Sequence, residues 1–307
     1  MKPSPPSTRL TAARLSTLSA TLSAALFATV CATATGANAI ETVAADALNE
    51  PAIEISSGEF KTPVVELYTS EGCSSCPPAD DWLRKLGASL ERDFNAVLLA
   101  FHVDYWNYLG WPDPYSKPEF TDRQRFAAAN HRRRTIYTPA FLVDGREARA
   151  GRRIVRAIEN ANAQPAQADI EARVVRRGDG VDNGDDHGDD HGDNNSGGDV
   201  IRARIEVDNN APNAAHYQMH VAVYESGITR RIGGGENRGR TLKHDFVVRH
   251  WSAPIVIRRG LNHAEVDVDI PADWRRPNLG LAVVIQNRRT FETLQAVSAS
   301  LAELFSG

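Results

Sequence analysis

The chain has 307 residues, 42% of them hydrophobic and 24% charged, and its formal net charge is −4 at pH 7. This ordinary composition indicates a globular protein of one or two domains. The small negative charge gives no support for a nucleic-acid partner, because binding to a phosphate backbone needs a surplus of Lys and Arg. The charge is uneven, since Asp179 to Asp199 contains eight Asp and no Lys or Arg.

The first 39 residues have the pattern of a secretory signal peptide. Lys2, Arg9 and Arg14 form a basic start, followed by a mildly apolar stretch from Leu15 to Val30. Ala37-Asn38-Ala39 then offers a small-residue cleavage site. The apolar stretch is too short and too polar to cross a membrane, and no second one follows. We therefore expect a periplasmic or secreted protein without a membrane span after cleavage.

Cleavage would leave 268 of the 307 residues and two cysteines, Cys73 and Cys76, because Cys31 lies in the leader. A disulfide between two such close cysteines closes a small loop and restricts the unfolded chain little. A redox role is therefore favoured over a structural staple. No second CxxC is present to complete a zinc site with these two cysteines, so we expect no metal and no cofactor.

Residues 61–164 alternate between strands and helices, after an N-terminal extension at 40–60. Apolar runs predict buried strands at Lys61 to Thr69 and at Ala96 to Val103, and a helix starts near Pro77. The other expected elements are a helix at Phe120 to Arg134, a hairpin of Ala140 to Val143 and Ala148 to Ala150, and a helix at Gly151 to Ala163. This alternation predicts an α/β domain.

Residues 165–307 change to period-two alternation, which predicts an all-β, β-sandwich-like domain. A polar Asp/Gly/His insert at 178–199 interrupts it and is expected to be disordered, because it has nothing to bury. Helical periodicity returns only at Ala296 to Phe305. The expected strands are Ile170 to Val174, Val200 to Val207, Tyr217 to Tyr224, Phe246 to Val248, Ile255 to Ile257, Ala264 to Ile270 and Leu279 to Ile285.

The pair Cys73 and Cys76 lies where a strand passes into a helix. Backbone N–H groups and the helix dipole favour a thiolate at that place. We expect Cys73 to be the exposed nucleophile and Cys76 the buried thiol that resolves a mixed disulfide. Glu71 would raise the pKa of Cys73 if its side chain pointed inward, so the expected depression is modest.

The order strand, CxxC, helix, strand, helix, Thr-Pro, hairpin, helix resembles the thioredoxin fold. That resemblance implies a cis peptide bond between Thr138 and Pro139, facing the cysteines and pairing with a bound substrate. The sequence departs from ordinary thioredoxins in having Gly72 before the first cysteine and Ser-Ser between the two. It also has Leu67 where thioredoxins bury an acid.

Two acids are candidates for a proton relay in the absence of that buried acid. Glu66 is one residue early and should point to the other face of its strand. A relay and a plain ion pair with an arginine are equally favoured for it. Asp104 follows the second strand, next to His102, which is more often simply hydrogen-bonded at such a place.

An aromatic segment follows the second strand, from Asp104 to Tyr115. Trp106 and Trp111 in this segment are candidate substrate-binding residues, since they could form an apolar lip beside the cysteines. The alternative is a plug over the sheet edge or a seam against the second domain. Arg132 to Arg134 are expected to be a solvated helix end, and Gly233 to Gly235 lack the spacing of a phosphate-binding loop.

Several longer motifs resemble an uncharacterised family of exported bacterial proteins, domain of unknown function 1223, with a thioredoxin-like N-terminal half. The resemblance covers nearly all of the chain after the leader except the insert, and it points to contact between Glu236 to His244 and the redox site. The motifs are Glu66 to Asp80, His102 to Trp106, Leu109 to Trp111, Tyr137 to Pro139 and Gly235 to His244.

The sequence therefore predicts an exported thiol–disulfide oxidoreductase, acting on a protein or small-molecule thiol or disulfide with an unknown redox partner. One alternative is a copper-handling protein that uses the two thiolates as soft ligands. The presence of only two Met and of no Met/His cluster near the site argues against it. The other alternative is a non-catalytic binding module whose disulfide only shapes a loop.

Overall fold

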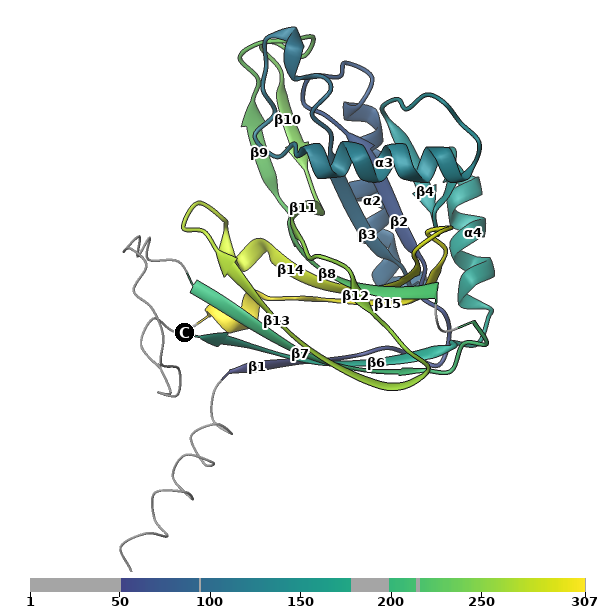
Figure 1. The fold of residues 1–307 in the computed structure, drawn as a ribbon. Coiled ribbons are helices and arrows are strands. Elements are labelled where there is room, and N and C mark those ends of the chain that lie inside the picture. Colours follow the sequence, from purple (N-terminus) through teal and green to yellow (C-terminus); the bar gives the residue numbers. More distant parts are fainter. Residues whose placement is uncertain (1–50, 94, 178–198, 214–215, 307) are drawn as a thin grey trace, which may run out of the picture. The chain divides into compact units, whose positions relative to one another are not determined.

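The computed structural model describes residues 51–93, 95–177, 199–213 and 216–306 (Figure 1). The signal peptide expected at 1–39 lies outside the described residues, as do most of the extension at 40–60 and residues 178–198 of the insert. The described residues all belong to one compact unit. None of the described helices is both long and apolar enough to cross a membrane.

A four-stranded antiparallel sheet contains β1 (Ala52–Ser56), β6 (Ala168–Arg177), β7 (Asp199–Asn209) and β13 (Gly260–Ile270), in the order β1-β6-β7-β13. Alternate residues of β6 and β7 are buried, as their period-two sequences require. Their inner side chains share one core with β8 and β14 of a second sheet. The outer face carries ion pairs such as Arg204 with Glu265.

A nine-stranded sheet holds most of the remaining strands, in the order β15-β14-β8-β11-β3-β2-β4-β5, with β12 paired to β8. Its two halves are joined where β11 runs parallel to β3, with Val247 opposite Ala100. The strands are β2 (Val64–Thr69), β3 (Val97–His102), β4 (Ala140–Val143), β5 (Arg146–Ala148), β8 (Tyr217–Glu225), β11 (Val247–Trp251), β12 (Ile255–Val256), β14 (Leu279–Asn287) and β15 (Thr293–Ser300).

The expected fold class, an α/β thioredoxin-like domain followed by an all-β domain, is wrong. The described chain is mostly β-sheet, and no separate α/β thioredoxin-like N-terminal domain is present in it. Strands β2 to β5, assigned to the first domain, continue through β11 into strands assigned to the second, and the sheet curls (Figure 1). Sequence alternation cannot reveal this, because the β3–β11 pairing joins residues almost 150 positions apart.

Three helices cover the two faces of the strands β2 and β3. Helices α2 (Pro77–Asp93) and α4 (Arg152–Asn162) pack on one face, through Leu83 and Ile154 among others. Helix α3 (Pro118–Asn130) packs on the other face, through Phe120. Figure 1 shows α3 in front of the sheet and α2 behind it.

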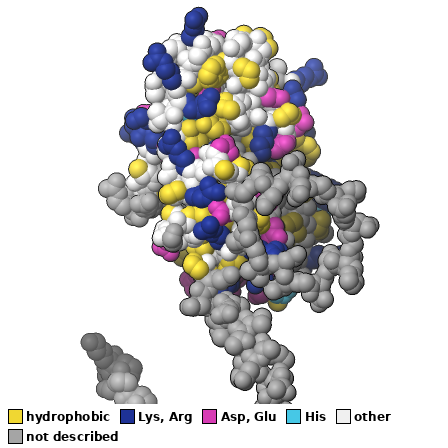
Figure 2. All heavy atoms as spheres, turned by 90° about the vertical axis from the view of Figure 1, so that its left-hand side faces the viewer, with side chains coloured by type: hydrophobic (Ala, Val, Ile, Leu, Met, Phe, Trp, Pro, Cys, Tyr) yellow, Lys and Arg dark blue, Asp and Glu magenta, His cyan; other side chains and the backbone are white. Residues whose placement is uncertain are grey.

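A small two-stranded sheet, β9 (Ile228–Arg231) with β10 (Thr241–His244), projects beside α2. Residues 232–240, here called the cap loop, connect the two strands. On this side of the molecule, Lys and Arg side chains are scattered among hydrophobic ones, without a continuous patch of either (Figure 2). The expected helix at Ala296 to Phe305 is wrong for its greater part, because β15 runs to Ser300 and only the one-turn η4 (Ala302–Phe305) is helical.

Candidate functional site

Cys73 and Cys76 form a disulfide at the start of α2, with their Cα atoms 5.4 Å apart. The helix begins at Pro77, a residue whose missing N–H and fixed φ suit the first helical position. The carbonyl of Cys76 accepts from the N–H groups of Ala79 (2.8 Å) and Asp80 (3.1 Å). The disulfide therefore lies at the positive end of the helix dipole, as the sequence predicted.

The expectation that Cys73 is exposed is wrong for the disulfide form. Neither cysteine has any exposed surface, although Ser74 and Ser75 between them are exposed. The hydroxyl of Ser75 lies 3.4 Å from Cys73 Sγ. The loop therefore presents its serines to solvent and keeps its sulfurs beneath, so the groups that cover the sulfurs control access to them.

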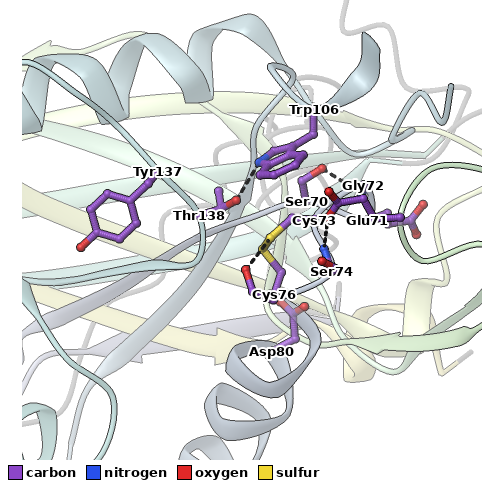
Figure 3. Close-up of a disulfide and its surroundings, with 12 residues drawn as sticks. Ser70, Glu71, Gly72, Cys73, Ser74, Cys76, Asp80, Trp106, Tyr137 and Thr138 are labelled. Carbon is purple, nitrogen blue, oxygen red and sulfur yellow. Dashed lines mark hydrogen bonds between the residues drawn. A yellow bond between two sulfur atoms is a disulfide. The ribbon is translucent and has the colours of Figure 1, made fainter. Parts of the chain in front are cut away.

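Trp106 and Thr138 lie on one side of the disulfide (Figure 3). The indole Nε1 of Trp106 donates to Thr138 Oγ1 at 2.7 Å, and the peptide bond between Thr138 and Pro139 is cis. Trp106 also packs on the backbone before the first cysteine, where a Cβ added to Gly72 would lie 3.1 Å from Trp106 Cβ. The structure thus brings Trp106, Thr138 and Pro139 to the disulfide, and glycine at 72 permits this close approach.

The cap loop holds the backbone around Cys73 through side chains more than 160 residues away. Asn237 Nδ2 donates to the carbonyls of Glu71 (2.9 Å) and Cys73 (2.8 Å), and Asn237 is fully buried. The N–H of Ser74 donates to Glu236 Oε2 at 2.9 Å. The expected contact between the Glu236 to His244 motif and the cysteines is therefore present.

Trp111 is placed differently from Trp106. Its Nε1 donates to Glu71 Oε2 at 2.8 Å, and its ring packs against the glycines of the cap loop. An added Cβ on Gly233 would lie 2.9 Å from this ring, which explains a glycine there. Trp111 thus forms a seam between the aromatic segment and the cap loop, the second of the two roles considered for that segment.

Five buried titratable residues gather beneath the disulfide. His244 Nδ1 lies 3.9 Å from Asp80 Oδ2, and His244 Nε2 lies 3.4 Å from Glu71 Oε1. His102 Nδ1 lies 2.7 Å from Asp113 Oδ2, and the two imidazole rings are 5.0 Å apart. Asp80 lies below Cys76 on the first turn of α2 (Figure 3). We call these five residues the acid–histidine cluster.

Several polar atoms of this cluster have no hydrogen-bond partner within the described protein. They are both ring nitrogens of His244, Nε2 of His102 and Oε1 of Glu71. Buried polar atoms in native proteins are nearly always hydrogen-bonded, and those left without a partner mark places of possible function. Arg230 Nε lies 3.1 Å from Glu71 Oε1, and its side chain reaches partly into solvent, so the cluster extends toward the surface.

The two aspartates of the cluster have opposite pKa shifts. Burial raises the pKa of Asp80 to about 7, and the nearby His244 only partly offsets this effect. Burial acts in the same direction on Asp113, but His102 and the backbone N–H groups of Glu71 and Tyr115 outweigh it and lower the pKa. Asp80 can therefore take up or release a proton near neutral pH beside Cys76.

The two residues predicted as a proton relay lie elsewhere. Glu66 points to the α3 side of the sheet, where Arg123 Nη2 donates to Glu66 Oε1 at 2.6 Å. Asp104 accepts from the hydroxyl of Thr121 at the start of α3. Neither belongs to the acid–histidine cluster. Sequence reasoning missed Asp80 and His244, although both lie in quoted motifs and Asp80 follows Cys76 by one helical turn.

Among the residues that the structure describes, no group of three or more His, Cys, Asp and Glu side chains is placed to hold a metal ion. What the geometry does define is a protein with a covered disulfide at a helix start, next to buried groups that can exchange protons.

The family described as "Protein of unknown function (DUF1223)" matches residues 64–286, and the chain belongs to this family. No curated protein matches the chain. The X-ray crystal structure of protein AGR_C_4864 from Agrobacterium tumefaciens is similar at 24% identity and a TM-score of 0.50, covering 80% of this chain and 96% of that one. HBP35 of Porphyromonas gingivalis is similar at 14% identity and a TM-score of 0.54, covering 80% and 76%. At these identities the likeness concerns the fold alone.

Proposed function

We propose that the protein exchanges thiols and disulfides through Cys73 and Cys76. The observation that carries this proposal is the juxtaposition of a helix-start disulfide with Asp80, a buried carboxyl group whose pKa is raised to about 7. A helix start stabilises a thiolate, and the carboxyl supplies the proton that the second sulfur needs. The family assignment says nothing about activity.

The exchange begins when a thiolate of the partner attacks Sγ of Cys73. A new S–S bond forms between the partner and Cys73, the bond to Cys76 breaks, and Cys76 leaves with the electron pair. Neutral Asp80 gives its proton to the Cys76 thiolate. In the opposite direction, the Asp80 carboxylate removes the proton from Cys76, which then attacks Cys73 and releases the partner as a thiolate.

Access to the covered sulfurs requires the cap loop to move away from the segment Glu71 to Ser74. The contacts to be broken are the two hydrogen bonds donated by Asn237, the one accepted by Glu236 and the packing of Trp111 on the cap-loop glycines. Net hydrogen-bond contributions of about 1 kcal/mol each allow such opening without global unfolding.

The decisive experiment is a redox titration of the purified protein in dithiothreitol or glutathione buffers, together with reduction of insulin disulfides. We expect a midpoint potential above about −300 mV. Turnover should be lost in Cys73→Ser, and Cys76→Ser should accumulate mixed disulfides. A midpoint far below −300 mV, or equal insulin reduction by Cys73→Ser, would overturn the proposal and leave an inert structural bridge.

Export to the periplasm or beyond the cell is part of the same proposal, and it rests on the leader pattern at residues 1–39. N-terminal sequencing of protein from the cell envelope should find a chain that begins at Ile40. An intact Met1 start in the cytosol would contradict it.

A further inference from the structure

Two hollows lie on opposite faces of β4 and share Tyr137, and one of them borders the disulfide loop. The first, of about 510 Å³, has Ser75 and Pro139 in its wall, and the second has a volume of about 470 Å³. Both are lined by Tyr137, a residue that is 45% exposed. A ligand that enters both hollows would therefore cross Tyr137 and end next to the CxxC loop.

Strand β5 runs along both hollows. Ala148 lines the first, while Arg146 and Glu147 line the second. Among the described strands, β5 is paired with β4 alone and stands at the end of the sheet order. An unpaired strand edge offers backbone donors and acceptors to an extended polypeptide. The shape thus favours an extended peptide segment over a compact small molecule.

The charge of the two hollows is positive. Arg149 is the charged residue in the wall of the first. In the second, Glu147 is already occupied by Arg133 and by the hydroxyl of Tyr137, which leaves Arg146. Neither Arg146 nor Arg149 has an acidic partner among the described residues, and both are exposed.

We propose that this groove, defined by the two hollows and the edge of β5, binds an extended acidic segment of a partner polypeptide. Carboxylates of the segment lie against Arg149 and Arg146, and an apolar side chain packs on Tyr137. The proposal deepens the proposed function, because the segment's cysteine or disulfide then lies at the Ser75 and Pro139 end. Complementary charge at such a site speeds association and selects among partners.

The test is fluorescence anisotropy with a labelled twelve-residue peptide of alternating Glu and Leu that contains no cysteine. Its counterpart has Lys in place of Glu. The double variant Arg146→Glu/Arg149→Glu is compared with Arg152→Glu/Arg153→Glu, which makes the same change of charge on exposed arginines outside both hollows. Circular dichroism and melting temperatures check that both variants fold.

We expect the acidic peptide to bind the wild type and the α4 variant, with affinities within about threefold of each other. Binding should fall by about tenfold or more in Arg146→Glu/Arg149→Glu, and the Lys peptide should not bind. Equal losses in both variants would show an unspecific effect of net charge and overturn the proposal. Binding of anionic phospholipid vesicles with no peptide binding would overturn it in favour of a membrane surface.

A second measurement separates this inference from the proposed function. The same peptides, each with one cysteine linked to a reporter thiol, are mixed with reduced protein and reporter release is followed. Faster release from the acidic peptide, lost in Arg146→Glu/Arg149→Glu, supports both proposals. Anisotropy binding without any reporter release leaves the groove as a binding site and removes the oxidoreductase. Release at equal rates from both peptides would support the oxidoreductase and overturn the groove as a binding site.

Discussion

Two buried polar clusters lie on opposite sides of strands β2 and β3, and they differ in how fully their atoms are bonded. On the α3 side, both oxygens of Glu66 accept hydrogen bonds, from Arg123 and from the hydroxyl of Tyr68. The guanidinium group is also enclosed by the rings of Phe101, Trp251 and Phe291, with its Cζ 4.5 to 5.3 Å from their centroids.

The acid–histidine cluster on the α2 side has four ring and carboxylate atoms without partners. A bonded and enclosed ion pair fixes structure, because any change of its charge leaves a buried group uncompensated. A cluster with open positions can instead gain or lose protons at moderate cost. The α3 side of this pair of strands therefore contributes to stability, whereas the α2 side contributes to proton exchange. This division can be tested.

The largest effect is expected for Glu66→Ala. It leaves the Arg123 charge buried and unpaired, which should lower the free energy of unfolding by about 3 to 5 kcal/mol. Urea unfolding at pH 7, followed by tryptophan fluorescence, measures the loss. The control is Glu206→Ala, whose partner His263 is exposed and whose effect should stay within about 0.5 kcal/mol. A change in the reduction potential of the disulfide in Glu66→Ala would contradict the division between a stabilising α3 side and a chemically active α2 side.

The second prediction concerns pH and Asp80. Because its pKa is raised from 3.8 in the reference state to about 7, its contribution to stability is fully present below pH 4 and is lost as pH rises through 7. Relative to Asp80→Asn, the wild type should lose about 4 kcal/mol of unfolding free energy between pH 4 and 8. Urea unfolding of the oxidised proteins across this range measures the difference, and a difference that does not vary with pH would refute the assignment.

The third prediction has the opposite sign and belongs to the α3 side. His220 stacks on Trp251 with ring centroids 4.5 Å apart, and burial together with the Arg123 charge lowers its pKa to about 4. Its contribution to stability is present above pH 6.5 and is lost as pH falls through 4. The wild type should therefore lose about 3 kcal/mol relative to His220→Gln between pH 7 and 4. Urea unfolding across the same pH range measures this difference. If the unfolding free energies of the two proteins changed equally with pH, the assignment would be wrong.

The smallest effect is expected at the cap loop. Asn237→Ala removes two hydrogen bonds to the backbone of Glu71 and Cys73, so the loop should open more often. Reduction of the disulfide by a water-soluble phosphine should accelerate by about thirtyfold, which corresponds to about 2 kcal/mol for the two hydrogen bonds. Arg238→Ala, on an exposed residue of the same loop, is the matched control. Equal rates in the two variants would mean that the loop does not limit access.

The parts of the site that depend on local motifs were predictable from sequence. The position of Cys73 and Cys76 at a helix start follows from a short pattern with a fixed backbone consequence. The side of β2 on which Glu66 lies follows from the two-residue period of a strand. These predictions needed only the conformation of neighbouring residues.

The parts that depend on distant pairing were not predictable. Burial raises the pKa of Asp80, with His244 partly offsetting the effect, and that burial requires β10 to lie against α2. The exposure of Cys73 was misjudged for the same reason, since the loop whose Asn237 binds the Cys73 carbonyl lies 164 residues away. The pairing of β11 with β3 was equally hidden from the sequence. It joins, in one sheet, strands from both sides of residue 165, where the sequence pattern suggested a domain boundary.

The distance between Cys73 and Asn237 has a consequence for biosynthesis. A ribosome adding about 5 to 20 residues per second delivers Asn237 and its cap loop on the order of 10 to 30 seconds after the two cysteines. During that interval the thiols are unshielded and open to any oxidant that the nascent chain meets. The oxidation state in which the chain first folds is therefore set by the surroundings of the growing chain.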